Sequence, residues 1–414
     1  MRRLLFLFTL IPFVFNGEPL TLEKAIQEAL EKNLSLLAER MNVSVADARI
    51  IQASLKPNPV LTYGQDYQDV FRPGLTAENS AGPPEFNVRT DFLFERGGKR
   101  EKRVEVAKQA RSVAELNLLN TIRQLFLDVQ SAYVDVLAAQ DSVQLAQENL
   151  KALISIVDIN SIRVKAGDLA AVELIRSRVA ALQFETAVKQ AQLKLVTAQN
   201  RLKLLLGRSQ VVEMPEVVGP LRQDKELLMV DELRTQSLQF RPDLQSIKRD
   251  QARSQADIRL QLANGKIDFT LSAMYHHQYG YSNGNAMGFF FSIPIPVWNR
   301  NQGEIARSER ESKQLGLRVQ AAEAVVRNEI ETAYQQYQTS RSLLENIEKN
   351  LLGQVREVRE ITEYSYRRGE ASLLEFLDAQ RAFNDAMQSY NDAKADYARS
   401  LYLIDSITGK TVNR

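Results

Sequence analysis

One segment of the chain carries most of the information about the fold. Residues 369–409 read GEASLLEFLDAQRAFNDAMQSYNDAKADYARSLYLIDSITG, with glycine at both ends and no proline or glycine between them. Residues 167–207 have the same arrangement 202 positions earlier (369 − 167 = 202), again with glycine only at the ends. Two segments of equal length at one offset indicate an internal two-fold repeat over about half of the chain, and therefore a pseudo-symmetric architecture.

Both segments have the hydrophobic spacing of a long α-helix. In the first, apolar or small residues recur every three or four positions at Leu174, Ser177, Ala181, Phe184, Val188, Ala191, Leu195, Ala198, Leu202 and Leu205. The same offset leads to Phe376, Ala379, Phe383, Ala386, Tyr390, Ala393, Tyr397, Ser400, Ile404 and Ile407. A mean spacing of about 3.5 residues is typical of coiled coils, and the alternating small residues allow neighbouring helices to approach closely.

A still longer helix is predicted before each of these segments. Residues 99–166 contain neither proline nor glycine and keep the same spacing. Such a helix would be roughly 100 Å long, at about 1.5 Å per residue. Its counterpart, at about 304–368, is expected to be similar but interrupted at Gly316 and Gly353. Each half thus predicts a long helix, a tight turn and a second helix that folds back, which suits a rod or a tube.

The composition excludes several classes of protein. The chain has 53 Lys and Arg residues against 51 Asp and Glu, so its charge does not single out nucleic acid as a partner. The absence of cysteine excludes a disulfide, a thiol nucleophile, a zinc-thiolate site and a lipid-modified N-terminal cysteine. His276 and His277 are adjacent and would face opposite sides of a strand, so they do not share a metal. With no evident nucleophile, base and orienting residue, we expect no enzyme, no cofactor and no bound metal.

The N-terminus resembles a secretory signal. Arg2 and Arg3 precede an apolar run from Leu4 to Phe15. This run is shorter than the about 20 residues that a membrane-spanning helix needs. We therefore expect export and cleavage near Gly17. The predicted organisation is a signal peptide (1–17), a first repeat (18–207), a linker (208–230), a second repeat (231–409) and a C-terminal tail (410–414).

Four stretches alternate apolar and polar residues as β-strands do, with one pair at about 60–94 and one at about 267–297. Their apolar positions are Leu61, Tyr63, Tyr67 and Phe71; Phe86, Val88, Phe92 and Phe94; Ile267, Phe269, Leu271, Ala273, Tyr275, Tyr279 and Tyr281; and Phe289, Phe291, Ile293 and Ile295, in a segment from Met287 to Val297. Strands of about ten residues with one apolar face are typical of transmembrane β-barrels, although a half-buried sheet in a soluble domain has the same pattern. The signal-like segment and the long helices favour the barrel.

Four strands are too few to close a membrane barrel, because the smallest have about eight and an open sheet edge is not tolerated in lipid. The pattern therefore predicts that several copies of the chain share one barrel that continues into a bundle of helices. Loops at 72–84 and 280–285 would join the strand pairs at the outer surface. The prolines of 57–59 and 294–296 mark the junctions of strand and helix, where ladder hydrogen bonding stops.

Four runs of residues resemble the TolC-like outer-membrane efflux proteins, and the resemblance extends over essentially the whole mature chain. They are LTLEKA at 20–25, FERGGKR at 94–100, PIPVWNRNQG at 294–303, and Gly369 followed by LEFLDAQR at 374–381. The GGKR run is similar to the heavy-metal cation efflux branch, whose members often carry a lipidated N-terminal cysteine that this chain lacks.

The resemblance implies a homotrimer in the outer membrane of a Gram-negative-type cell. Its fold would be mainly α with a membrane β-barrel: a 12-stranded barrel with four strands per chain, continued by a long α-helical coiled-coil tunnel in the periplasm. The implied partners are outer-membrane lipid, a periplasmic adaptor protein and a proton-driven inner-membrane pump that docks at the tip of the tunnel.

The resemblance also implies a gate at the periplasmic tip. Glu375 and Asp378 match the acidic rings of the tunnel entrance, Leu374 matches an apolar constriction, and Arg381 matches a basic partner. By their spacing Leu374, Asp378 and Arg381 share one helix face. Carboxylates repeated around a narrow, water-filled pore favour cations. The plain alternative is that these charges belong to a solvated helix end.

The first half provides less of the predicted gate. Glu173 and Arg176 stand at the corresponding positions, and only Glu173 has the same charge as its counterpart in the second half. We therefore do not expect the first half to contribute equally to the gate. The turns of both hairpins resemble the adaptor-contact loops of the family. The candidate contact residues are Gly167, Asp168, Leu169, Ala170, Gly369, Glu370, Ala371 and Ser372. Glycine gives a helix reversal the backbone freedom it needs, so a purely structural turn explains the same pattern.

The predicted function is that of a passive exit duct in a tripartite efflux system, conducting metal cations or small toxic compounds to the exterior. Two alternatives remain open. One is the outer-membrane channel of a type I protein secretion system, powered by an ATP-driven exporter. The other is a structural coiled-coil protein of the periplasm that conducts nothing, against which the four strands argue. Substrate choice and energy coupling reside in the partners, so the sequence does not separate the first two.

Overall fold

The structure is a computed structural model that describes residues 19–67, 84–208, 215–224, 227–279 and 284–409. The predicted signal peptide, the C-terminal tail and most of the two loops between paired strands lie outside these ranges. The chain divides into two compact units. The first comprises Met1–Glu39, Leu119–Arg241 and Val325–Arg414, and the second comprises Arg40–Leu118 and Pro242–Ala324. Each unit therefore draws on both halves of the sequence.

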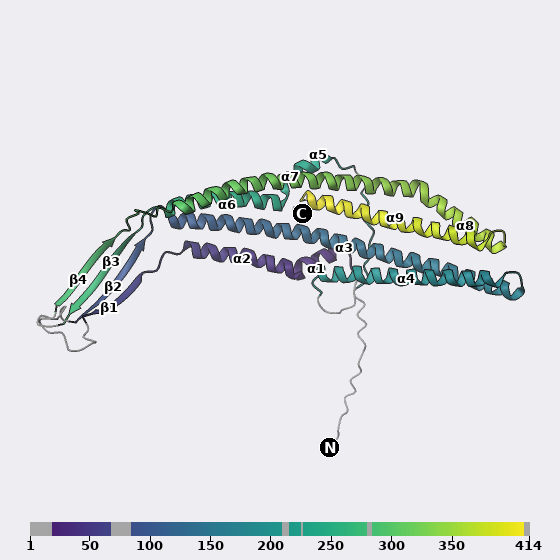
Figure 1. The fold of residues 1–414 in the computed structure, drawn as a ribbon, viewed down its shortest axis with the longest axis horizontal. Coiled ribbons are helices and arrows are strands. Elements are labelled where there is room, and N and C mark those ends of the chain that lie inside the picture. The colour runs from purple at the N-terminus through teal and green to yellow at the C-terminus, as the bar shows by residue number, and fades with distance from the viewer. Residues whose placement is uncertain (1–18, 68–83, 209–214, 225–226, 280–283, 410–414) are drawn as a thin grey trace, which may run out of the picture. The chain divides into compact units, whose positions relative to one another are not determined.

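Helices make up most of the described chain (Figure 1). They are α1 (Leu22–Lys32), α2 (Leu34–Ser54), α3 (Lys99–Ala166), α4 (Ala171–Leu205), α5 (Val230–Phe240), α6 (Pro242–Asn264), α7 (Gln302–Asn346), α8 (Leu352–Arg368) and α9 (Leu373–Ile407). The bounds of α3 are those predicted from the stretch of residues without proline or glycine. Among the described residues, no helix is both long enough and apolar enough to cross a membrane.

The repeat is confirmed in the two returning helices. Helices α4 and α9 both have 35 residues, and their ends differ by the offset of the sequence repeat. Gly207 and Gly409 follow them with φ of 71° and 73°. A Cβ atom at Gly207 would lie 2.3 Å from the carbonyl oxygen of Lys32 at the end of α1, and one at Gly409 would lie 3.0 Å from that of Phe240 at the end of α5. The same close approach therefore recurs in both halves, and only glycine fits it.

The second long helix differs from its prediction. Gly316 lies within α7 and does not interrupt it, because one glycine costs a long packed helix only about 1 kcal/mol. The interruption is a π-helical turn, Ile347–Leu351, which ends two residues before Gly353. Ile347 is buried and the next inward residue is Leu352, five positions on instead of three or four. The wider turn takes up the extra residue and keeps the apolar seam on one side.

The four predicted strands form one antiparallel sheet in the order β1-β2-β3-β4. Their bounds are β1 (Val60–Asp66), β2 (Glu85–Phe94), β3 (Phe269–Gln278) and β4 (Gly284–Ser292). The register places Phe92 opposite Leu271, and Leu271 opposite Phe291, so one face of the sheet is apolar. Polar residues such as Asp91 and Ser272 pair on the other face. The predicted alternation is thereby confirmed.

The apolar face of the sheet is exposed within the chain. Phe289 is 80% exposed and Leu61 71%. The prediction that the last strand continues to Val297 is wrong, because β4 ends at Ser292 and Pro294 and Pro296 have no N–H group for a ladder bond.

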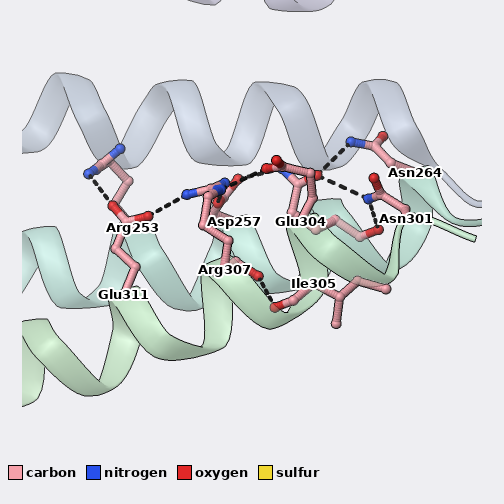
Figure 2. A network of polar contacts seen from close by, with 10 residues as sticks. Arg253, Asp257, Asn264, Asn301, Glu304, Ile305, Arg307 and Glu311 are labelled. Atoms are coloured by element: carbon pink, nitrogen blue, oxygen red, sulfur yellow. Dashed lines mark hydrogen bonds and ion pairs between the residues drawn. The ribbon is translucent and has the colours of Figure 1, made fainter.

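Within the second unit, α6 and the start of α7 are joined by polar contacts (Figure 2). Arg307 donates to Glu304 at 2.6 Å, to Glu311 at 2.5 Å and to Asp257 on α6 at 3.1 Å. The bonds to Glu304 and Asp257, that to Glu304 first, raise the pKa of the Arg307 guanidinium above its usual value. The side chain remains half exposed, so the contacts orient the two helices more than they stabilise them.

Candidate functional site: the tip of the helical hairpins

Both hairpins of the first unit reverse direction in the same way. Gly167 follows α3 with φ of 87°, and Gly369 follows α8 with φ of 83°. One residue further on, the N–H of Asp168 donates to the carbonyl of Arg163, and that of Glu370 to the carbonyl of Ser365, both at 2.9 Å. A hydrogen bond from an N–H to the carbonyl five residues earlier, together with a glycine in the left-handed conformation, is the Schellman motif. Open space surrounds both glycines, so they are needed for backbone conformation and not for close packing.

The returning helices begin differently. Ser372 Oγ accepts a hydrogen bond from the N–H of Glu375 at 3.2 Å, and Glu375 Oε2 accepts from the N–H of Ser372 at 2.7 Å. This capping box lowers the pKa of Glu375, first through the backbone bond and then through the Ser372 hydroxyl. Ala170, at the start of α4, has no side-chain cap. Sequence reasoning missed the cap, although the Ser-x-x-Glu pattern at 372–375 is its known signature.

The predicted gate residues of α9 share an exposed face. Leu374 is 66% exposed, although it is apolar. Asp378 and Arg381 form an ion pair at 3.7 Å, with side chains 63% and 55% exposed. Glu375 lies beside them but its carboxylate is bonded to Ser372. An exposed pair of this kind adds little stability, so these residues are free to serve another role.

The first half carries a similar pair on α4. Glu173 accepts a hydrogen bond from Arg176 at 2.8 Å, and the Arg176 side chain is largely exposed. Within the described ranges, each pair stays on its own helix and no ion pair joins the two sets.

The tips of the two hairpins pack against each other through one apolar cluster. Its buried members come from α3, α4, α8 and α9: Leu153, Ile156, Ala180, Tyr366, Leu373, Phe376 and Leu377. The rings of Tyr366 and Phe376 are stacked with centroids 5.5 Å apart. Because the cluster buries several large side chains, it holds α8 and α9 firmly against the first hairpin.

Polar contacts between α3 and α8 surround this cluster. The Tyr366 hydroxyl donates to Asn160 Oδ1 at 2.7 Å, where Asn160 is fully buried. Arg163 Nη1 donates to the carbonyl of Tyr366 at 3.3 Å, and Nη2 donates to that of Arg367. Carbonyl groups at the end of a helix have no partner within the helix, and a cation is favoured there. Burial also raises the pKa of Tyr366, so the hydroxyl keeps its proton.

A second polar layer lies further from the turns. Gln380 Nε2 donates to Asn149 Oδ1 at 2.9 Å, and Asn149 Nδ2 donates to Asn384 Oδ1 at 2.7 Å. Asn149 and Gln380 are buried. No motif marks these residues or Asn160 and Arg163, which is why sequence reasoning did not find them.

Hairpins of long helices reversed at glycine and an exposed apolar sheet face are the features expected of an outer-membrane channel of the efflux type. The family described as "Outer membrane efflux protein" matches residues 25–208 and 233–410, and the chain belongs to this family. Membership confirms the predicted location in the outer membrane, and the family consists of channels and not of enzymes.

Individual relatives agree with this assignment. The cobalt-zinc-cadmium resistance protein CzcC of Cupriavidus metallidurans is 25% identical over 369 residues, covering 88% of this chain and 84% of the relative. The pyoverdine export outer membrane protein OpmQ of Pseudomonas putida is 22% identical, with 87% and 80% covered. The CmeC outer membrane channel of Campylobacter jejuni has the same fold, with a TM-score of 0.79, 17% identity and coverage of 94% and 85%.

Proposed function

We propose that the protein is the outer-membrane exit duct of a tripartite efflux system, a homotrimer that conducts its substrate passively and is gated at the hairpin tips. The observation that carries the proposal is the way in which the charged face of α9 is held by the rest of the first unit. Leu374, Asp378 and Arg381 are exposed on a hairpin whose other side is held to α3 by Asn160 and Arg163. The apolar cluster is not directional and can repack, whereas the few polar bonds to α3 fix one arrangement, so exchange of these bonds can move the hairpin as a unit and carry the charged face with it.

The edges of the sheet support the trimer. Strands β1 and β4 lie at the two ends of the strand order, so each leaves one edge unpaired within the chain. An unpaired edge is not tolerated in lipid. Pairing β4 of one copy with β1 of the next is a head-to-tail contact, which forms a closed ring when the rotation closes. Three copies would contribute the twelve strands expected of this barrel.

The polar contacts of α8 and α9 with α3 hold the proposed closed state with limited strength. The Nδ2 atom of Asn160 is buried and has no hydrogen-bond partner among the described residues. The same holds for Oε1 of Gln380. Buried polar groups that are only partly satisfied lower the stability of an interface compared with a fully bonded or fully apolar one. The closed contact is therefore specific but of limited strength, as a gate requires.

Metal cations are the substrate class that we favour. The curated relative of higher identity is named for cobalt, zinc and cadmium resistance, whereas the other is named for pyoverdine export. The two carboxylates of Glu375 and Asp378 outnumber the single cation Arg381 on the proposed gate, and three-fold symmetry would repeat this excess of negative charge. Such a ring raises the local concentration of cations. Neither relative is named for protein secretion, so the type I alternative gains no support from them.

A crosslinking experiment in live cells tests the proposal. A photoreactive residue is placed at Glu370, which is exposed in the turn, because Ser372 is needed to cap α9. The control position is Ser389, exposed on α9 and distant from the turn along the helix. We expect position 370, and not 389, to capture an adaptor of a proton-driven pump. Capture of an adaptor belonging to an ATP-driven polypeptide exporter would reverse the assignment, and equal capture at both positions would place docking elsewhere.

A further inference from the structure

Three loops of the second unit meet where the sheet passes into the helices. Lys99 Nζ, at the start of α3, donates to Asp268 Oδ2 at 2.6 Å and to the carbonyl of Lys266 at 2.9 Å. The N–H of Arg96 donates to the other Asp268 oxygen at 2.8 Å. Lys99 is buried, so this cluster is a fixed part of the structure. It joins the loop after β2 to the loop before β3.

The loop after β4 is attached to the same place. Asn301 Nδ2 donates to the carbonyl of Gln261 on α6 at 2.8 Å. A Cβ atom at Gly265 would lie 2.8 Å from the carbonyl oxygen of Arg300, so these two loops touch. A cavity of about 670 Å³ opens between them, and Lys266, Ile295, Trp298 and Arg300 are among its lining residues.

This junction carries three cations without a counter-ion. Arg96, Lys266 and Arg300 have no ion-pair partner in the part of the chain that the structure describes. The nearby carboxylates are already engaged: Asp268 with Lys99 at 2.6 Å, Glu95 with Arg103 at 3.0 Å, and Glu304 with Arg307 at 2.6 Å (Figure 2). The positive charge of the three loops is therefore available to an anionic ligand.

The apolar face of the sheet ends at this junction. From Met287 the odd-numbered residues of β4 and the following loop are apolar as far as Val297, and Trp298 follows, 87% exposed. The eight steps of β4, from Gly284 to Ser292, span roughly 26 Å at about 3.3 Å each, and the exposed residues Ile293, Ile295 and Val297 continue its apolar surface. Together they give the sheet an apolar surface comparable in height with the band of about 25 Å that an outer-membrane barrel presents to lipid. Trp298 and Arg300 would then lie at the boundary between hydrocarbon and headgroups.

We propose that Lys266 and Arg300, which line the cavity, bind the phosphate of an anionic phospholipid in the inner leaflet of the outer membrane, and that Arg96, exposed on the neighbouring loop, adds to the positive charge that attracts it. Trp298 and Ile295 contact the part of its acyl chains that lies next to the headgroup. This inference rests on the proposed function, since it requires the apolar sheet face to meet lipid. Arginine and lysine are the side chains that bind phosphate groups best, and tryptophan is enriched at membrane interfaces. A fixed lipid at this place would hold the sheet at a constant depth above the periplasmic helices.

Native mass spectrometry of the full-length protein tests the inference. The oligomer is purified in detergent and offered dioleoyl-phosphatidylglycerol or dioleoyl-phosphatidylcholine. We expect selective retention of phosphatidylglycerol, and a loss of that affinity in the variant Arg96→Gln/Lys266→Gln/Arg300→Gln. Each cation close to an anionic headgroup contributes about fivefold, so the triple change should weaken binding about 100-fold. The matched control is Arg249→Gln/Lys313→Gln/Arg318→Gln, which removes the same charge from exposed positions on α6 and α7 and should bind as the wild type does.

The outcomes are distinguishable. Equal lipid binding by the wild type and the triple variant overturns the inference. Altered ion selectivity of the triple variant in planar bilayers also overturns it, because the three side chains would then line the duct. Conductance of the wild-type oligomer reports the proposed function separately, and its absence would count against the duct itself. If the triple variant does not assemble, Arg300→Gln alone and the salt dependence of wild-type binding decide, since an electrostatic site must weaken as salt rises.

Discussion

Removing the Tyr366 hydroxyl should open the gate more often. In Tyr366→Phe the ring remains stacked on Phe376, whose centroid lies 5.5 Å away, so the apolar cluster keeps its packing. The change deletes only the 2.7 Å bond from the hydroxyl to Asn160 Oδ1. Because Asn160 Nδ2 already has no partner among the described residues, the buried amide then loses its remaining side-chain bond.

The size of the effect follows from that loss. A buried polar group left without a partner costs about 1–3 kcal/mol, and we take about 2 kcal/mol for this one. The cost applies to the closed state only, since an opened hairpin exposes Asn160 to water. A change of about 2 kcal/mol shifts the ratio of closed to open hairpins about thirtyfold towards open in each protomer, and the effect on the channel is at least that large.

Single-channel recording in planar bilayers measures this ratio directly. The control is the double variant Asn160→Leu/Tyr366→Phe, in which both partners are apolar and the interface carries no orphaned amide. Replacing both partners of a buried hydrogen bond is close to neutral, so the double variant should return towards wild-type gating. If the double variant opens as readily as Tyr366→Phe, the contact between α3 and α8 is not what holds the gate closed.

Three further predictions concern charge, capping and pH. The variant Glu375→Gln/Asp378→Asn should lower the preference for cations over anions in bilayer recordings, because it removes the proposed carboxylate ring; unchanged selectivity would contradict the gate assignment. Ser372→Ala should speed hydrogen exchange in the first turn of α9, since the cap is worth about 1 kcal/mol, whereas Ala170→Ser should slow exchange in α4 by adding a missing cap. Burial raises the pKa of Tyr133 to about 12, and its hydroxyl donates to the carbonyls of Leu20 and Val218. This stabilisation is complete below the ordinary tyrosine pKa of about 10 and is lost as pH rises through about 12, so thermal melts should show a smaller alkaline loss in Tyr133→Phe than in the wild type.

Local patterns were sufficient for most of the fold. The bounds of α3, α4 and α9 follow from glycines and from a spacing that repeats every three or four residues, because helical contacts are made between near neighbours. The strands were recognised from alternation for the same reason. Predictions were less accurate where one local pattern is compatible with two structures. An extra residue in the helical spacing can interrupt the helix or be accommodated in a π-helical turn. An apolar run that contains prolines can be a strand or a loop.

The candidate site was predicted only in part. Leu374, Asp378 and Arg381 share an exposed face as their spacing requires, and Glu375 could have been recognised as a cap partner from Ser372. Their role in gating remains a prediction. Nothing near Arg163 in the chain indicates that its guanidinium would reach the carbonyls of residues 366 and 367.

By itself, the sequence determined the repeat, the helices with their turns at Gly167 and Gly369, and the alternating strands, since each depends on contacts within a few residues. Only the tertiary structure decided which polar residues meet across the hairpins. Asn160 and Tyr366 are separated by 206 residues, and the two are brought within hydrogen-bond distance by the packing of four helices on one apolar cluster. The hydrophobic effect is not directional. An apolar pattern in the sequence therefore shows which face of a helix is covered, but not which residues of another helix cover it.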